Sequence, residues 1–158
     1  MRVQFLLNVL LTIVWVFLTG VFSAYNFWAG FILSYLVLWL ISDNEKSKKY
    51  FVIVPRILGF VFYFIFQLIK ANIQVASDVI LPKIRLEPGI IRYPLDAKTD
   101  LEITMLANVI TLTPGSFSLD ISDDRKALYI HAMHIDTKEK FIHGIKNGYE
   151  KRILKILR

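Results

Sequence analysis

The 158-residue sequence contains no cysteine, which excludes a disulfide framework, a thiolate nucleophile and a cysteine-based zinc site. It also contains no aspartate, glutamate, lysine, arginine or histidine between residues 3 and 42. A membrane-spanning helix needs about 20 apolar residues, so this stretch has room for two short spans. The sequence therefore predicts that the first part of the chain lies in a membrane.

Two spans are expected within this stretch, at about residues 3–20 and 26–42. Gly20 and a small polar patch after it separate the two apolar runs. The whole run exceeds the h-region of about 7–15 residues in a signal peptide, so cleavage is not expected. Gly30 and Ser34 are four residues apart in the second span, a small-residue spacing that would let another helix approach closely.

Positive charge marks both ends of this predicted hairpin. The polar loop at residues 43–49 contains three lysines, and Arg2 lies at the other end. Positive charge in short loops is typical of the cytoplasmic side of a membrane. Both ends of the hairpin are therefore predicted to face the cytoplasm, with the turn at residues 23–26 outside.

A third apolar helix is predicted at about residues 52–80, with Pro55 suited to its start. Only residues 57–69 are free of charge, which is short for a full span. Snorkelling of Arg56 and Lys70 toward opposite headgroups would allow the helix to cross. An interfacial helix would instead keep the rest of the chain on the side of the basic loop. The sequence leaves both arrangements open.

The expected fold class is an α-helical membrane protein with a small C-terminal α+β domain. Two or three apolar helices form a membrane domain at residues 1–81, and residues 82–158 form the soluble domain. In that domain the predicted order of elements is strand, helix, strand, strand, helix, which describes a small α+β layer.

The patterns behind this order are local. The first strand is expected at residues 89–95, where Pro94 limits it to the edge or the end of a sheet. Thr99 and Glu102 have the spacing of a capping box at the start of a helix. Phe117, Leu119 and Ile121 then alternate with polar residues, which is typical of a half-buried strand. A hairpin partner is expected at residues 128–135, and Thr137 begins the last helix.

Residues that could support catalysis or bind a metal are few and scattered. His131 and His134 would point to opposite faces of a regular strand, and His143 has no cluster of carboxylates around it. The sequence contains no G-x-S-x-G elbow and no phosphate-binding glycine loop. No catalytic residue, metal site, cofactor or small-molecule substrate is therefore predicted for this chain alone.

The distribution of charge also bears on function. A net charge of +6 in a membrane protein is more typical of contact with anionic lipid than with nucleic acid. A proton or sodium carrier needs ionisable groups at membrane depth. Lys70 and Asp78 are interpreted as lying at or beyond a membrane interface, and their roles stay open. The chain alone is not expected to conduct ions.

A cluster of helix-ending residues follows the predicted second-domain helix. Pro114 cannot continue that helix, and Gly115 can adopt the positive φ that a sharp turn requires. Asn108, Thr111 and Thr113 can satisfy backbone groups that are freed where the helix ends. We interpret these five residues as a structural junction. A small anion or ligand site in the same turn is the functional alternative.

The same region resembles the E subunit of the Mrp-type (Mnh) multisubunit sodium/proton antiporters. The resemblance is greatest at residues 106–116 (LANVITLTPGS), continues through residues 119–121 and 128–131, and extends over nearly the whole chain. Residues 132–134 (AMH) depart from the aromatic-rich stretch of the family.

This resemblance implies an accessory subunit of a monovalent cation (sodium)/proton antiporter, needed for assembly or activity and not itself the ion conduit. Its partners would be the other antiporter subunits and the lipid bilayer. The location would be the bacterial cytoplasmic membrane, with a multi-pass chain and a cytoplasmic C-terminal domain. A stand-alone membrane-anchored binding module is the main alternative. A membrane enzyme would require a pocket with convergent ionisable residues.

The predicted hairpin orientation can be tested with single cysteines at Ser23 and Ser47, because the chain has no cysteine of its own. An impermeant thiol reagent applied to intact cells is expected to label Ser23→Cys and to leave Ser47→Cys unmodified. The opposite labelling pattern would show that the hairpin is inverted.

Overall fold

The computed structural model describes residues 2–42, 45–80 and 87–158, and its contacts divide the chain into two compact units. The units are Met1–Pro55 and Arg56–Arg158, so the third helix contributes to both. The division into a membrane domain at residues 1–81 and a soluble domain at residues 82–158 remains a prediction.

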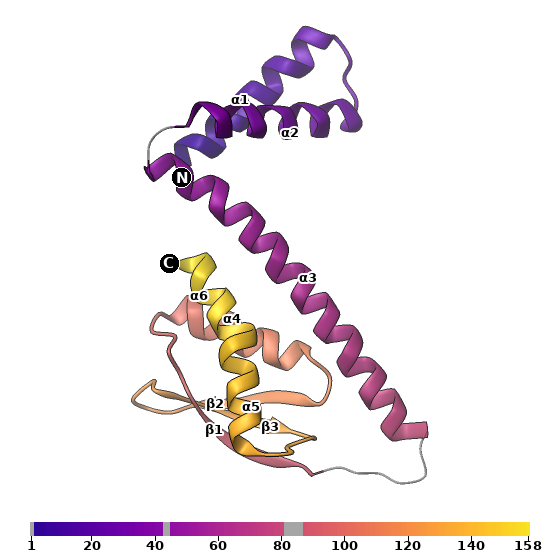
Figure 1. The fold of residues 1–158 in the computed structure, drawn as a ribbon, viewed down its shortest axis with the longest axis vertical. Coiled ribbons are helices and arrows are strands. Elements are labelled where there is room, and N and C mark those ends of the chain that lie inside the picture. Colours follow the sequence, from indigo (N-terminus) through magenta and orange to yellow (C-terminus); the bar gives the residue numbers. More distant parts are fainter. Residues whose placement is uncertain (1, 43–44, 81–86) are drawn as a thin grey trace. The chain divides into compact units, whose positions relative to one another are not determined.

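The first unit contains a hairpin of two apolar helices, α1 (Arg2–Thr19) and α2 (Ala24–Ile41), shown in indigo and violet in Figure 1. Both helices were predicted, and both begin and end slightly earlier than expected. Gly20 ends α1 with a φ of +66°, a conformation that glycine adopts without strain. By length and composition α2 is long enough to cross a membrane, whereas the apolar stretch of α1, Val3–Thr19, is shorter.

Asn26 holds the turn of this hairpin together. Its side-chain oxygen accepts a hydrogen bond from the indole N–H of Trp15 at 3.0 Å. Its amide group donates to the hydroxyl of Thr19 and to the carbonyl of Val21. Ser23 caps α2 by accepting from the backbone N–H of Asn26. These bonds satisfy polar groups that would be costly in hydrocarbon.

The small residues of α2 face α1. Gly30 and Ser34 are both buried, and a Cβ built on Gly30 would lie 2.6 Å from Cδ1 of Trp15. The close helix approach predicted from this spacing therefore occurs within the hairpin itself.

The third helix, α3 (Glu45–Ile80), begins earlier than predicted. Residues 43 and 44 of the predicted polar loop lie outside the described residues, and α3 already includes Lys49. The prediction that Pro55 lies at the helix start is wrong, because Pro55 lies inside the helix. Proline has no N–H to offer the carbonyl four residues earlier. That carbonyl, of Phe51, instead accepts a hydrogen bond of 3.0 Å from the hydroxyl of Tyr35 on α2.

The second unit contains an antiparallel sheet of three strands in the order β1-β3-β2. The strands are β1 (Gly89–Pro94), β2 (Ser116–Ile121) and β3 (Ala127–Ala132). The predicted hairpin of β2 and β3 is confirmed, and β1 is an edge strand that ends at Pro94, as its proline indicates. β3 ends at Ala132 rather than at residue 135, so His134 lies beyond the strand.

Helix α4 (Asp100–Leu112) and the C-terminal helix cover one face of the sheet (Figure 1). The C-terminal helix consists of α5 (Lys138–Ile145), a π-helical turn η1 (Lys146–Glu150) and α6 (Lys151–Leu157). The order strand, helix, strand, strand, helix is thus confirmed. Both predicted caps are present: Thr99 and Glu102 form a capping box, and Thr137 caps α5. The core between sheet and helices contains Tyr93, Leu106, Ile110, Leu128, Ile130, Ile145 and Ile153.

The apolar row of β2 faces away from this core. Phe117 is 51% exposed and Leu119 is 47% exposed, whereas Ser116 and Ser118 of the alternate row are partly buried. A register shift between Ser118 and Asp120 interrupts the pairing of β2 with β3. The alternation correctly predicted a strand, but the exposed row is the apolar one, because the serines face α4.

Two buried carboxylates fasten the chain between β1 and α4 to the C-terminal helix. Glu150 accepts hydrogen bonds from the hydroxyl of Tyr93 at 2.6 Å and from the backbone N–H groups of Asp96 and Ala97. Glu102 accepts a hydrogen bond from the guanidinium of Arg158 at 3.0 Å. This bond, together with hydrogen bonds from backbone N–H groups, lowers the pKa of Glu102 to about 2. Buried charge is tolerated here because each carboxylate has several donors.

Beyond Pro55, α3 packs along the C-terminal helix, and Tyr63 is the centre of the contact. The Tyr63 hydroxyl occupies the space where a side chain on Gly148 would begin. Its ring packs edge-to-face on Tyr149 at 5.7 Å, and the guanidinium of Arg152 lies 4.1 Å from its centroid. Nearer the start of this unit, Arg56 donates to the carbonyl of Lys155 at 2.8 Å. This part of α3 is thus built into the C-terminal domain.

The hairpin contact predicts different effects for two glycine substitutions. Gly30→Ala places a methyl group against Trp15 and is expected to destabilise the protein by about 1–3 kcal/mol. Gly59→Ala is the matched control, because its Cβ meets nothing within 4 Å and a helical alanine is favourable. Thermal dissociation of the detergent-purified protein, followed by size-exclusion chromatography, measures both. Equal melting temperatures for Gly30→Ala and the wild type would refute the close contact.

Candidate functional site

The turn that follows α4 is the place where the predicted site residues lie. Thr113 is the C-cap of α4, and its backbone N–H donates to the carbonyl of Ile110. Gly115 has a φ of +85°, in the region that favours glycine. Its carbonyl accepts from the backbone N–H of Met133 at 2.8 Å, which joins the turn to the end of β3. The chain therefore passes from helix to strand within residues 113–116.

Hydroxyl groups satisfy the backbone of the last turn of α4. The Thr113 hydroxyl donates to the carbonyl of Val109 at 2.9 Å. The Ser116 hydroxyl donates to the carbonyl of Ile110 at 2.8 Å and contacts the carbonyl of Thr113 at 3.1 Å. The helix end leaves too few N–H groups for its last carbonyls, so these side-chain hydroxyls act as additional donors.

Two further contacts connect α4 to β2. The Thr111 hydroxyl accepts from the backbone N–H of Ser118 at 3.2 Å, and the Ser118 hydroxyl donates to the carbonyl of Ala107. Sequence reasoning missed Ser116 and Ser118 as members of this junction. The signal that could have revealed them is the serine row of β2, which was taken as the exposed row.

Asn108 does not join this network. It is exposed on α4, and none of the hydrogen bonds found among the described residues involves its side chain. Its expected part in satisfying freed backbone groups is therefore not seen, whereas Thr111 and Thr113 both have such contacts.

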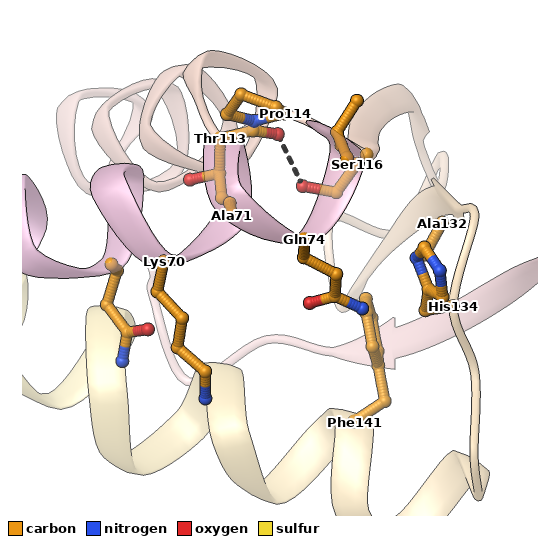
Figure 2. Close-up of a pocket in the computed structure, with 12 residues that line it drawn as sticks. Lys70, Ala71, Gln74, Thr113, Pro114, Ser116, Ala132, His134 and Phe141 are labelled. Carbon is orange, nitrogen blue, oxygen red and sulfur yellow. Dashed lines mark hydrogen bonds between the residues drawn. The ribbon is translucent and has the colours of Figure 1, made fainter. Parts of the chain in front are cut away.

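An open pocket of about 200 Å³ lies between this turn, α3 and α5. Figure 2 shows Lys70 and Gln74 of α3 reaching toward the helix that carries Phe141. Thr113 also contacts the Tyr149 hydroxyl at 3.3 Å, and burial raises the pKa of Tyr149. The junction thus touches both the C-terminal helix and a pocket with a basic side chain, Lys70, in its wall.

Asp78 of α3 contacts the loop after β3. Oδ2 of Asp78 lies 3.0 Å from Nε2 of His134, and both side chains are largely buried. Sequence reasoning did not connect these two residues, because they are far apart in the chain and His134 was placed on a strand. Among the residues that the structure describes, no group of three or more histidine and acidic side chains could hold a metal ion. The Asp78–His134 contact joins the end of α3 to the sheet.

The polar side chains around the turn have structural roles. Its hydroxyls are used as hydrogen-bond donors and acceptors to backbone groups. A general base adjacent to a nucleophile is the arrangement that hydrolytic chemistry requires. His134 lines the same pocket and contacts Asp78, and the hydrogen bonds found among the described residues do not join it to a hydroxyl of the turn.

The fold defines a membrane protein with an N-terminal helical hairpin and a small C-terminal α+β domain. Residues 8–156 match the model of the Na+/H+ ion antiporter subunit family, and the chain belongs to that family. The family is one of transporter subunits.

Relatives support this assignment over the full chain. The "Na(+)/H(+) antiporter subunit E1" of Staphylococcus haemolyticus (strain JCSC1435) is 42% identical over 99% of this chain and 98% of its own length. The protein of the same name from Staphylococcus aureus (strain JH9) is 38% identical, with the same coverage.

Two solved structures are similar as well. A chain of the Mrp complex from Dietzia sp. DQ12-45-1b has a TM-score of 0.51 at 28% identity, covering 65% of this chain and 96% of its own length. A chain of the membrane-bound sulfane sulfur reductase, an archaeal respiratory membrane complex, has a TM-score of 0.55 at 27% identity. It covers 95% of this chain and 96% of its own length.

The junction predicts a graded response to substitution. Gly115→Val forces a β-branched residue to a positive φ, with an expected cost of about 1–3 kcal/mol and reduced assembly. Thr113→Val removes the hydroxyl contacts with the Val109 carbonyl and the Tyr149 hydroxyl, and it is expected to be milder, with a loss of about 0.5–1.5 kcal/mol for each hydrogen bond. Gly144→Val is the control, because Gly144 is exposed and its Cβ meets nothing within 4 Å. Native gels of membrane extracts measure the assembled fraction. Normal assembly of Gly115→Val with loss of transport would show that the turn is functional.

Proposed function

We propose that this chain is an accessory subunit of a multisubunit sodium/proton antiporter, needed for assembly or activity and not itself the ion conduit. Its partners are the other subunits of that antiporter. The family and the E1 relatives support the subunit role. The observation that carries the accessory role is that residues 3–41, which include nearly all of α1 and α2, contain no aspartate, glutamate, lysine, arginine or histidine.

The polar groups of the hairpin have structural contacts instead. Asn8 donates to the hydroxyl of Tyr50, and the Thr12 hydroxyl donates to the carbonyl of Asn8. Both Asn8 and Thr12 are fully buried. Ion carriers in membranes use carboxylates or histidines that face a cavity, and neither residue type is present in these two helices.

The outward surfaces suit a subunit that is packed against larger partners. Many large apolar side chains of α1 and α2 are exposed, as expected for contact with lipid or with other helices. In the C-terminal domain, Phe117 and Leu119 of β2 and Ile90 of β1 are exposed as well. These exposed apolar side chains of the two edge strands are available for a contact with another protein.

The proposal includes an orientation. The hairpin spans the bacterial cytoplasmic membrane, and the C-terminal domain lies in the cytoplasm. The basic residues that follow α2 in the sequence support this orientation, because short positive loops stay on the cytoplasmic side.

The test is sodium-dependent proton flux in everted vesicles, normalised to the amount of assembled antiporter. Deletion of the chain is expected to lower flux and assembly together. Lys70→Met and Asp78→Asn are each expected to leave the flux per assembled antiporter largely unchanged. His134→Gln serves as the matched control for Asp78→Asn, since it removes the other side of the same contact.

A proton carrier would give a different result. Loss of about tenfold or more in flux per assembled antiporter, equivalent to about 1.4 kcal/mol or more, in Lys70→Met or Asp78→Asn would contradict the accessory role. The same loss in His134→Gln would assign the effect to the Asp78–His134 contact as a whole.

A further inference from the structure

The part of α3 beyond Pro55 carries two stripes of side chains on opposite sides. The partly buried stripe has helical spacing and faces the C-terminal domain; it contains Phe60, Tyr63, Gln67, Ala71, Val75 and Asp78. The opposite stripe is apolar and 45–79% exposed; it contains Leu58, Phe62, Ile65, Ile69, Ile73 and Ile80. The exposed side of this helix is thus more apolar than the side packed on protein.

The contacts with the C-terminal domain extend along the whole of this segment. They begin with Arg56, which donates to the carbonyl of Lys155, and end with Asp78, which contacts His134. The 22 residues between these contacts rise by about 33 Å in an α-helix. That length equals the roughly 30 Å thickness of a bilayer hydrocarbon core.

The shared length of α3 and the domain surface favours one of the two arrangements that the sequence leaves open. Residues 49–80 are long and apolar enough to cross a membrane by composition alone. If they crossed, the domain surface packed along them would lie in hydrocarbon. That surface includes the Arg152 guanidinium, and Lys70 would lie near the middle of the segment. Each such charge at the bilayer centre costs about 2.5–3.5 kcal/mol on insertion scales.

We propose that residues 56–80 of α3 lie in the plane of the membrane, at the boundary between the headgroups and the acyl chains of one leaflet. The stripe from Leu58 to Ile80 enters the acyl layer, and the C-terminal domain lies on the water side of the helix. Arg56 and Lys70 are exposed toward the side of the C-terminal domain, away from the apolar stripe, so their charges stay out of the acyl layer.

This inference goes beyond the accessory role and does not rest on it. An in-plane helix does not change sides, so the C-terminal domain stays on the side of the membrane where α3 begins. The proposed cytoplasmic location of the domain would then follow from the positive charge after α2.

The test is depth measurement by spin labels on the full chain in the assembled antiporter, reconstituted in vesicles containing anionic lipid. Single cysteines replace Leu58, Phe62, Ile69 and Ile73, and the other subunits carry no reactive cysteine. Relaxation by oxygen, which concentrates in hydrocarbon, is compared with relaxation by a water-soluble nickel complex. All four labels are expected at the same shallow depth of about 5–10 Å.

Two reference positions calibrate the scale: Leu10→Cys on α1 for the hydrocarbon and the exposed Lys98→Cys for water. A crossing helix would spread the four labels along about 22 Å of helix axis, with depth changing along the series, and this result would overturn the proposal. Immobile labels that neither reagent reaches would also overturn it, because a partner subunit would then cover the stripe. If Phe62→Cys does not assemble, Phe66→Cys reports from a neighbouring exposed position.

Discussion

The packing of Tyr63 on Gly148 makes the second half of α3 part of the C-terminal domain. A side chain at residue 148 would occupy the space of the tyrosine hydroxyl, so only glycine allows the two helices to approach this closely. Gly148 lies in the π-helical turn of the C-terminal helix, a local irregularity that often marks a special contact. Tyr149 and Arg152 enclose the same ring from the sides. Because this packing holds α3 against the C-terminal helix, it also determines where α3 meets residues 113–116 at the pocket and where Asp78 meets His134.

In each unit several polar side chains bind backbone groups, while a set of large apolar side chains stays exposed at the surface. The Tyr35 hydroxyl replaces the N–H that Pro55 lacks, and the hydroxyls of Thr113 and Ser116 replace those missing at the end of α4. Meanwhile the stripe of α3 and the row of β2 that contains Phe117 stay exposed. Several buried polar groups of such a chain have hydrogen-bond partners, but part of its apolar surface is not covered by the chain itself. This suits a subunit in contact with lipid and with other subunits.

Local patterns in the sequence predicted most elements of the fold. The capping box of Thr99 and Glu102, the Thr137 cap of α5 and the proline at the end of β1 each depend on neighbours within a few residues. Features that depend on distant residues could not be predicted in the same way. The continuation of α3 through Pro55 depends on Tyr35, twenty residues earlier, and the inward orientation of Ser116 and Ser118 depends on α4.

The residues of the candidate site also divide into those that local sequence predicts and those whose contacts depend on distant residues. Gly115 and Thr113 were identified because their own chemistry ends a helix, and Asn108 was included because its residue type fits that role, although it is exposed. The contacts of Lys70 with the pocket and of Asp78 with His134 arise only when α3 lies along the domain. Periodicity alone could not reveal this, because an apolar helix of such length is equally typical of a membrane span.

A density map of the assembled antiporter in lipid nanodiscs tests the central claim most directly. The account predicts that residues 56–80 follow the surface of one headgroup layer, with the C-terminal helix packed along them from Arg56 to Asp78. A map in which residues 56–80 cross the hydrocarbon core from one headgroup layer to the other would contradict it.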